Sequence, residues 1–122
     1  MRLGGRDIEL KKDTLAWKLF SKADSIRRRF RHRYEVDPDY ISKLEENGLV
    51  FSGKAPNLPI MQILELPELS FFMGTQSHPE LTSRPMRPSP MLVALTAAAR
   101  KRKFAEAQMD APLSAVEKTA RF

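Results

Sequence analysis

A histidine and a glutamate separated by one proline are the residues of this sequence whose types and spacing could do chemistry. In Ser77-His78-Pro79-Glu80, the imidazole of His78 and the carboxylate of Glu80 are two residues apart. A carboxylate beside an imidazole fixes the tautomer and stabilises the protonated ring, which is the base-and-orienter half of a nucleophilic triad. So short a pattern also arises by chance. The spacing alone therefore favours a surface histidine and glutamate in a proline-rich loop.

The segment Arg31-His32-Arg33-Tyr34-Glu35 is a second candidate site. A guanidinium binds a carboxylate through two parallel hydrogen bonds, so an arginine here could hold an anionic substrate. The same residues could instead form a structural network of ion pairs or an exposed basic patch. From the residues alone, the structural interpretation is favoured.

Composition limits the chemistry that the chain can perform by itself. The chain has 122 residues and no cysteine. That length corresponds to one domain at most, or to part of one. The absence of cysteine excludes disulfides, cysteine-based zinc sites and a cysteine nucleophile within these residues. His32 is the other histidine besides His78, and no third ligand is implied, so no metal site is expected.

The positive charge is concentrated in two clusters, at residues 27–33 and 100–103, and the formal net charge is +6. Such clusters could bind phosphates or nucleic acid, or they could be solvated faces. A small basic nucleic-acid-binding or regulatory protein is therefore the alternative function, although no recognisable nucleic-acid motif supports it. Residues 1–12 contain no apolar signal-peptide segment, and no apolar run approaches the length of a membrane span. A cytoplasmic location is the default expectation.

Turn residues and apolar periodicity predict the elements that must position His78. The first half is predicted to contain an extended segment over 1–10, a short helix after Asp13 or Thr14, a strand over 34–36, and a helix over 38–47 that Asp37 and Pro38 begin. Residues 49–52 and 60–66 are predicted to form an antiparallel hairpin around a turn at 53–59.

The remaining elements lead into and out of the candidate site. A strand over 71–76 is predicted to run directly into His78, and the four prolines within 79–90 predict an irregular loop. A helix is expected from about 90 to 108, with Leu92, Leu95 and Ala99 on its apolar face. The last residues, 109–122, are expected to fray.

Seven segments in order resemble the C-terminal end of the glutamine amidotransferase domain of CTP synthases, from residue 1 to about residue 100. Two of them narrow the resemblance to this family: Arg-His-Arg-Tyr-Glu-Val at 31–36 and Ser-Arg-Pro-Met-Arg-Pro-Ser-Pro at 83–90. The His-Pro-Glu sequence is shared by many class I amidotransferases. The other segments are Met-Arg-Leu-Gly at 1–4, Leu-Glu-Glu-Asn-Gly-Leu at 44–49, Phe-Ser-Gly at 51–53, Glu-Leu-Pro at 65–67 and Gly-Thr-Gln-Ser-His-Pro-Glu at 74–80.

The resemblance implies a fold and a domain division. The fold class is α/β, a partial flavodoxin-like class I glutamine amidotransferase domain. It would contain an antiparallel hairpin, a strand that ends at the His-Pro-Glu loop, and a C-terminal helix. Residues 1–108 would be the C-terminal half of that domain, and residues 109–122 a variable tail.

The resemblance also implies a function. CTP synthases use ATP and Mg²⁺ to add ammonia to UTP, and they obtain the ammonia by hydrolysing glutamine. Their triad is Cys-His-Glu, in which His78 and Glu80 match the histidine and the glutamate. Arg33 matches the arginine that helps to bind glutamine. The parent enzyme would be a homotetramer, and a separate synthase domain would use ATP and Mg²⁺, with no cofactor in this chain.

Several departures from the family pattern accompany these matches. The cysteine nucleophile and its Gly-x-Cys-x-Gly turn belong upstream of residue 1 in the family, as does the synthase domain. The chain is therefore expected to be a fragment that is inactive and marginally stable in isolation. Ser77 also stands where the family usually has an aromatic residue before the histidine. Loss of that ring is expected to loosen the packing around His78.

Overall fold

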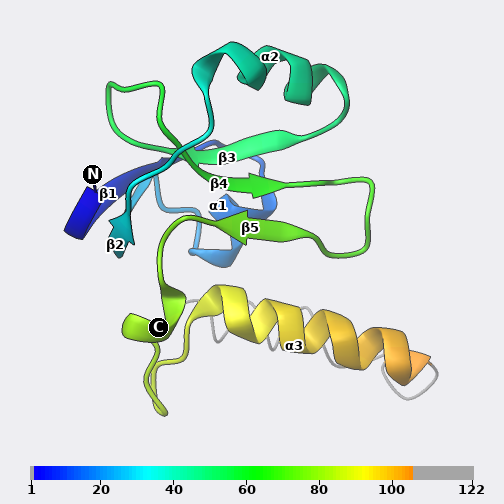
Figure 1. Ribbon diagram of the computed structural model, residues 1–122. Coiled ribbons are helices and arrows are strands. Elements are labelled where there is room, and N and C mark those ends of the chain that lie inside the picture. The colour runs from blue at the N-terminus through cyan, green and yellow to red at the C-terminus, as the bar shows by residue number, and fades with distance from the viewer. Residues whose placement is uncertain (1, 106–122) are drawn as a thin grey trace.

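A computed structural model describes residues 2–105, and its centre is a five-stranded sheet in which all neighbouring strands are antiparallel (Figure 1). The strands are β1 (Arg2–Leu10), β2 (Ser25–His32), β3 (Val50–Lys54), β4 (Met61–Glu65) and β5 (Met73–Thr75). The helices in this part of the chain are α1 (Leu15–Leu19), α2 (Pro38–Glu46), α3 (Pro90–Lys103) and the single 3₁₀ turn η1 (Pro79–Leu81).

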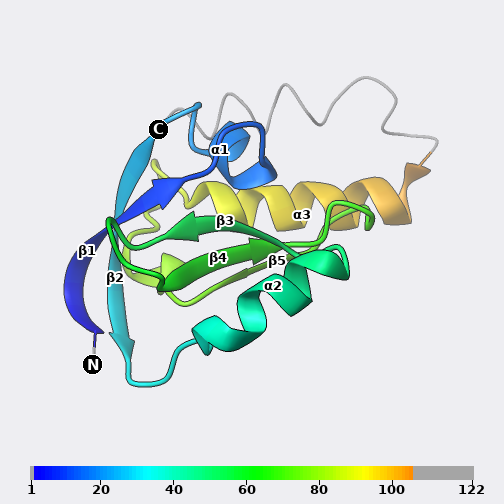
Figure 2. The ribbon, with the colours of Figure 1, turned by 90° about the horizontal axis from the view of Figure 1, so that it is seen from above.

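The strand order is β2-β1-β3-β4-β5. β1 and β2 pair over almost their whole length, from Arg2 opposite His32 to Glu9 opposite Ser25. Only the end of β1 pairs with β3, through Glu9 with Lys54 and Leu10 with Gly53. The β1–β2 ribbon consequently curls away from the plane of the other three strands (Figure 2).

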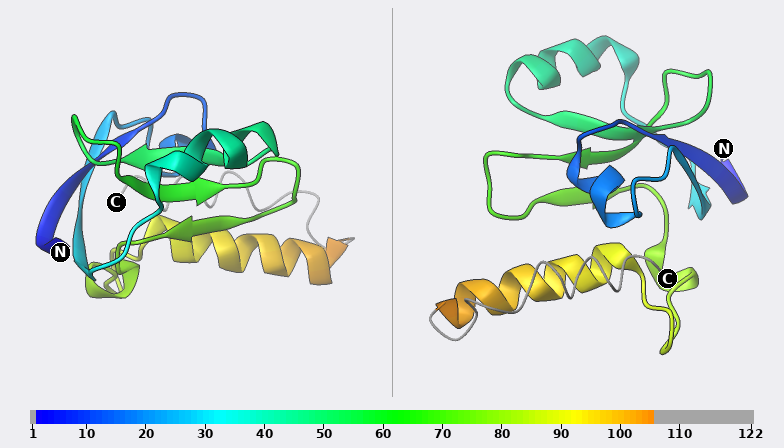
Figure 3. Two further views of the ribbon diagram at one scale, coloured as in Figure 1. Left: turned by 45° about the horizontal axis from the view of Figure 1, so that its top comes forward. Right: turned by 180° about the vertical axis from the view of Figure 1, so that it is seen from behind.

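Helices lie on both faces of the sheet. α1 lies behind the sheet and contacts both β3 and α3, whereas α3 runs alongside the sheet, past the edge that β5 forms (Figure 3). α2 lies on the opposite face, against β3. Among residues 2–105, no helix has both the length and the apolar character needed to cross a membrane.

The main core fills the space between the sheet and α1. Its buried residues come from the sheet, from α1 with the residue that follows it, and from α3: Ile8, Leu10, Ala16, Phe20, Phe30, Ile63 and Met91. Gly53 permits this packing, because a Cβ atom at that position would lie 2.9 Å from side-chain carbons of both Ile8 and Ile63. A second, smaller cluster joins Leu19 of α1 to Ala94 of α3.

Two local predictions are confirmed by the structure. α2 begins where expected, because the Asp37 side chain accepts a hydrogen bond from the Asp39 amide and Pro38 occupies the first turn. β3 and β4 form the predicted antiparallel hairpin, although β3 continues through Lys54, so the turn begins later than expected. The fold is the α/β arrangement expected, with the sheet followed by a C-terminal helix.

The predicted strand over residues 34–36 is wrong, because the strand lies upstream at Ser25–His32. Residues 34–36 have no regular structure. In β2 the inward positions alternate with exposed ones, and Phe30 is the fully buried member. The sequence does not show this alternation, because arginines occupy both exposed and partly buried positions and an arginine is not counted as apolar. Pairing with β1, rather than intrinsic strand preference, makes this segment a strand.

The apolar face predicted for α3 is also wrong. Leu92 and Leu95 are 40% and 53% exposed, whereas Met91 and Ala94 are buried against the core.

The bounds of α3 and β5 also differ from those predicted. Lys103 is the last residue of α3, whereas the helix is expected to reach about residue 108; residues 106–108 and the tail at 109–122 fall outside the described residues. β5 is shorter than predicted, because only Met73–Thr75 pair with β4. The loop at 79–90 contains η1 and a bridge between Arg84 and Arg87.

Glu65 connects the sheet to α1. Its side chain is buried at the end of β4, and the residue is only 4% exposed. One carboxylate oxygen accepts from the Leu15 amide at 2.8 Å, and the other accepts from the Ala16 amide at 3.2 Å. The Thr14 hydroxyl accepts from the next amide, that of Trp17. The free amides at the start of the helix are thus satisfied, and a negative charge lies at its positive end.

We predict that Glu65→Gln lowers the free energy of unfolding by about 1–3 kcal/mol, because charge-assisted bonds to two amides are weakened. The measurement is urea unfolding followed by the fluorescence of Trp17, the single tryptophan, which lies in α1 itself. Glu68→Gln is the matched control at an exposed position and should change stability by no more than about 0.5 kcal/mol. Equal effects of the two substitutions would contradict this role for Glu65.

Gln62, in the same strand as Glu65, is a buried polar residue whose side chain has no hydrogen-bond partner among the described residues. It is 2% exposed, and neither the nitrogen nor the oxygen of its side-chain amide has a hydrogen-bond partner among the described residues. A buried amide without a partner loses its hydration and gains nothing in return. We therefore predict that Gln62→Met raises the free energy of unfolding by about 1 kcal/mol, whereas Gln62→Glu lowers it. A less stable Met variant in the same urea experiment would refute this explanation.

Candidate active site

The structure brings His78 and Glu80 into direct contact. His78 Nδ1 lies 2.7 Å from Glu80 Oε1, on the turn that follows β5. The His78 side chain is 28% exposed and that of Glu80 is 58% exposed, so the pair lies at the surface and not in the core. With Nδ1–H donating to the carboxylate, the lone pair of the neutral ring is on Nε2. The ring is thus oriented to accept a proton at Nε2.

The pair is held by the backbone around it. The His78 amide donates to the Arg29 carbonyl of β2 at 3.0 Å, which fixes the start of the turn. The amides of Leu81, Thr82 and Ser83 then donate to the carbonyls of His78 and Pro79, which closes η1. Because Pro79 restricts φ, the two side chains are presented on one side of a rigid turn.

Ser77 stabilises the approach to the turn. Ser77 is 6% exposed, and its hydroxyl lies 2.7 Å from that of Thr75. Its amide also donates to the Thr75 hydroxyl at 3.1 Å. The position where an aromatic residue was expected from the resemblance is therefore occupied by a small buried group with its own hydrogen bonds.

The surroundings of Glu80 favour its ionised form. The pKa of Glu80 lies below its usual range, mainly because its own backbone amide bonds to the carboxylate, and further because His78 donates to it. The electrostatic influence of His78 and of the Arg31 guanidinium acts in the same direction on this pKa. Arg31 of the Arg-His-Arg-Tyr segment thus influences the His-Pro-Glu turn electrostatically, a connection between two motifs that are far apart in sequence.

Arg33 lies just beyond the end of β2 and is exposed. Within residues 2–105, its guanidinium forms no hydrogen bond or ion pair, so it is available to a ligand. The backbone beside it approaches the strand that leads to His78, since Gln76 Nε2 lies 3.5 Å from the Tyr34 carbonyl oxygen. The structure thus places Arg33 on the segment next to the histidine, without a direct contact to His78 or Glu80.

The other polar residues of that segment have a structural role. Glu35 Oε1 lies 3.3 Å from both Arg2 Nε and His32 Nε2. The ring of His32 packs edge-on against Phe30 at a centroid distance of 5.5 Å. These contacts fix the end of β2 against β1. No three His, Asp or Glu side chains gather to hold a metal ion in the part of the chain that the structure describes.

Comparison with known proteins identifies the family. The family model for class-I glutamine amidotransferases matches residues 2–97. The chain belongs to this family. The matched residues include β5, the His-Pro-Glu turn and the first half of α3, which follow one another in the chain.

Curated relatives point to one branch of the class-I amidotransferases. The chain is 51% identical over 105 residues to the CTP synthase of Thermococcus gammatolerans and 48% identical over 101 residues to that of Archaeoglobus fulgidus. These matches cover 85% and 83% of the chain but only 20% and 19% of the relatives. The chain thus spans about a fifth of their length, which confirms the predicted resemblance to part of a CTP synthase.

A solved structure also shows similarity to a CTP synthase. The glutaminase domain of the Trypanosoma brucei CTPS, solved with bound acivicin, superimposes with a TM-score of 0.79 at 36% sequence identity. The match covers 83% of this chain and 40% of that one. The described part of the chain therefore has the fold of part of a CTPS glutaminase domain.

We predict that an NMR titration places the pKa of Glu80 below its usual value and that His78→Gln raises it. The pKa in the variant should still be low, because the bond from the Glu80 amide persists. A lowered pKa in the folded state means that ionised Glu80 favours folding above the pKa of the unfolded chain. This contribution is lost as the pH falls through the folded-state pKa.

His32→Gln is the matched control, because it removes the other histidine, whose ion pair is with Glu35. The titration of Glu80 should be the same in this variant as in the natural chain. If His78→Gln also left it unchanged, the contact between His78 and Glu80 would not exist in solution.

Proposed function

We propose that this chain is the C-terminal part of the glutaminase domain of a CTP synthase, in which His78 and Glu80 serve glutamine hydrolysis. The ammonia released would be used in the ATP-dependent amination of UTP to CTP. The observation that carries the proposal is the 2.7 Å contact from His78 Nδ1 to Glu80 Oε1. This contact leaves Nε2 of a partly exposed ring free to act as a base.

In the proposed reaction, the nucleophile is a cysteine thiol supplied by a segment of the parent enzyme outside these 122 residues. His78 Nε2 removes the thiol proton as sulfur attacks the side-chain amide carbon of glutamine. The imidazolium then gives that proton to the leaving nitrogen, so ammonia departs and a thioester remains. Water, deprotonated by His78, hydrolyses the thioester to glutamate and restores the thiol. Glu80 orients the ring and stabilises the imidazolium throughout.

We further propose that Arg33 binds the carboxylate of glutamine. Its guanidinium is exposed and forms no ion pair within the described residues, and its segment lies beside the strand that leads to His78. The bound acivicin of the Trypanosoma brucei CTPS glutaminase domain supports a site for a glutamine-like molecule in a protein of this fold. ATP, Mg²⁺ and UTP would bind to a synthase domain elsewhere in the parent, which we expect to be a homotetramer.

The 122-residue chain alone should release no ammonia from glutamine above the uncatalysed rate. No side chain in it can form the thioester, because the sequence contains no cysteine. The measurement is coupled detection of ammonia with purified chain and excess glutamine. Release that persists after repeated purification and disappears in the His78→Ala variant would contradict the proposed need for an external thiol.

In the full-length parent enzyme, His78→Ala should lower the glutamine-dependent kcat about 10²- to 10⁴-fold. CTP formation from added ammonia should be preserved, because that route bypasses the glutaminase site. Arg33→Ala should instead raise the KM for glutamine about tenfold or more, since it removes a charged contact to the substrate.

Arg102→Gln, in the exposed last turn of α3, is the matched control for the loss of a positive charge. It should leave both kinetic constants unchanged. Equal loss of glutamine-dependent and ammonia-dependent activity in His78→Ala would indicate a general folding defect and contradict the catalytic role.

A further inference from the structure

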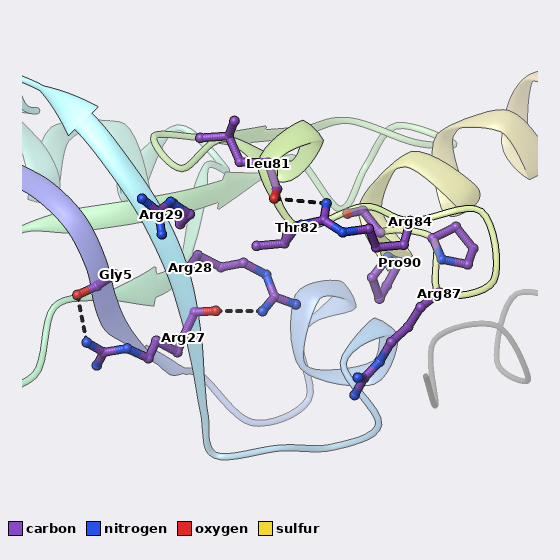
Figure 4. Close-up of a pocket in the computed structure, with 11 residues that line it drawn as sticks. Gly5, Arg27, Arg28, Arg29, Leu81, Thr82, Arg84, Arg87 and Pro90 are labelled. Carbon is purple, nitrogen blue, oxygen red and sulfur yellow. Dashed lines mark hydrogen bonds between the residues drawn. The ribbon is translucent and has the colours of Figure 1, made fainter.

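A cavity of about 710 Å³ opens between β2, the β1 segment beside it and the loop that leads into α3 (Figure 4). This volume is within the range of about 300–1,000 Å³ that is usual for small-molecule sites. Five arginines line the cavity, three from β2 and two from the loop: Arg27, Arg28, Arg29, Arg84 and Arg87. None of its described lining residues is acidic or aromatic. The cavity is separate from the contact between His78 and Glu80.

Arg28 is the arginine that β2 extends across this cavity, toward the side that carries Arg87 and Pro90 (Figure 4). Its guanidinium packs over the ring of Phe20, 4.7 Å from the centroid, and donates to the Arg27 carbonyl at 2.7 Å. Burial lowers the pKa of Arg28, because the charged group has lost part of its hydration without gaining a carboxylate. Arg27 differs, since it already forms an ion pair with Asp7 at 3.0 Å.

The loop presents a second arginine from the opposite wall. Arg84 donates from Nη1 to the carbonyls of Leu81 and Ser83, at 3.2 and 2.8 Å. The backbones of Arg84 and Arg87 also bond to each other in both directions, which makes the loop a tight turn. Two positively charged groups on separate elements are therefore fixed around one space before any ligand binds.

Ser89 is an independent indication of a ligand. It is 4% exposed and lines the cavity, yet its hydroxyl has no hydrogen-bond partner among the described residues. It occupies the N-cap position of the 14-residue helix α3 without capping it. In a helix that begins at Pro90, the Met91 amide has no acceptor within the helix. A buried hydroxyl donor and the positive end of a helix therefore meet the arginines at one place.

We propose that this cavity binds a short chain of phosphate groups, either inorganic or carried on a small organic molecule. Guanidinium groups form paired hydrogen bonds with phosphate oxygens, and the Ser89 hydroxyl can donate a further one. Several negative charges in one small ligand would balance the arginines that face the cavity from β2 and from the loop. A single-stranded nucleic acid is disfavoured, because the lining offers no aromatic ring on which a base could stack.

The test is isothermal titration calorimetry of the full 122-residue chain with inorganic tripolyphosphate. Three variants are compared with the natural sequence: Arg28→Gln, Ser89→Ala and Arg102→Gln. Arg28→Gln removes a charge inside the cavity but keeps a polar stem over Phe20. Arg102→Gln removes the same charge from the exposed end of α3 and is the matched control.

One ligand should bind per chain, and Arg28→Gln should weaken binding about tenfold or more. Ser89→Ala should weaken it several-fold without lowering the melting temperature, because the hydroxyl has no partner to lose in the free protein. Arg102→Gln should have a small effect that disappears as salt is added. Equal weakening in all three variants, or no binding at low salt, would overturn the proposal.

A second measurement does not depend on substitutions. Phenylglyoxal modifies accessible arginines, and tripolyphosphate should protect Arg28 and Arg84, but not Arg102, when modified sites are mapped by mass spectrometry. Uniform protection, or none, would count against a defined site.

ATP, titrated in parallel, distinguishes the two sources of the phosphate chain. Tighter binding of ATP indicates an organic phosphate, and tighter binding of tripolyphosphate indicates an inorganic one. An RNA oligonucleotide that binds more tightly than both, and that tripolyphosphate fails to displace, would refute a small-molecule site.

Discussion

The rest of the structure depends on the buried carboxylate of Glu65. It ends strand β4, which lies between β3 and β5, and accepts hydrogen bonds from the first two amides of α1. A helix of five residues is too short to be stable by itself, so this contact and the Thr14 cap determine where α1 lies. α1 in turn packs against α3 through Leu19 and Ala94. The position of α3 then fixes the end of the loop that follows the His-Pro-Glu turn.

β2 is the second organising element, because it contributes to both sites through different groups. Its backbone holds the histidine, since the Arg29 carbonyl accepts the His78 amide. Its side chains act separately: Arg31 lowers the pKa of Glu80, and Arg28 extends into the cavity beside α3. Long pairing with β1 keeps the strand rigid enough to do both. The arginines of residues 27–33 lie close together in sequence, but the strand geometry directs them to different places. Arg31 acts on Glu80, whereas Arg28 lines the cavity.

The sequence predicts those features of the structure that depend on residues close together in the chain. α2 follows from Asp37 and Pro38, and the contact between His78 and Glu80 follows from a spacing of two residues across a proline. The sequence-based predictions are wrong where contacts between residues far apart in the chain determine the structure. β2 does not follow from the sequence, because its burial depends on pairing with β1. The buried face of α3 is set by α1, which packs against Met91 and Ala94 rather than Leu92 and Leu95. The cavity was missed for the same reason, since its two walls are more than fifty residues apart in sequence.

The same distinction explains what the chain would contribute to the proposed glutaminase site. A base and its orienting carboxylate can be built from four consecutive residues, because η1 and Pro79 supply the geometry locally. In the proposed reaction, a thiol must approach Nε2 from another element, because no residue within this sequence has one. The pair at His78 and Glu80 is thus organised before its reaction partner is present. Since a positioned base removes the need for rearrangement in the transition state, the proposed glutamine hydrolysis would require only that a cysteine sulfur come within hydrogen-bond reach of His78.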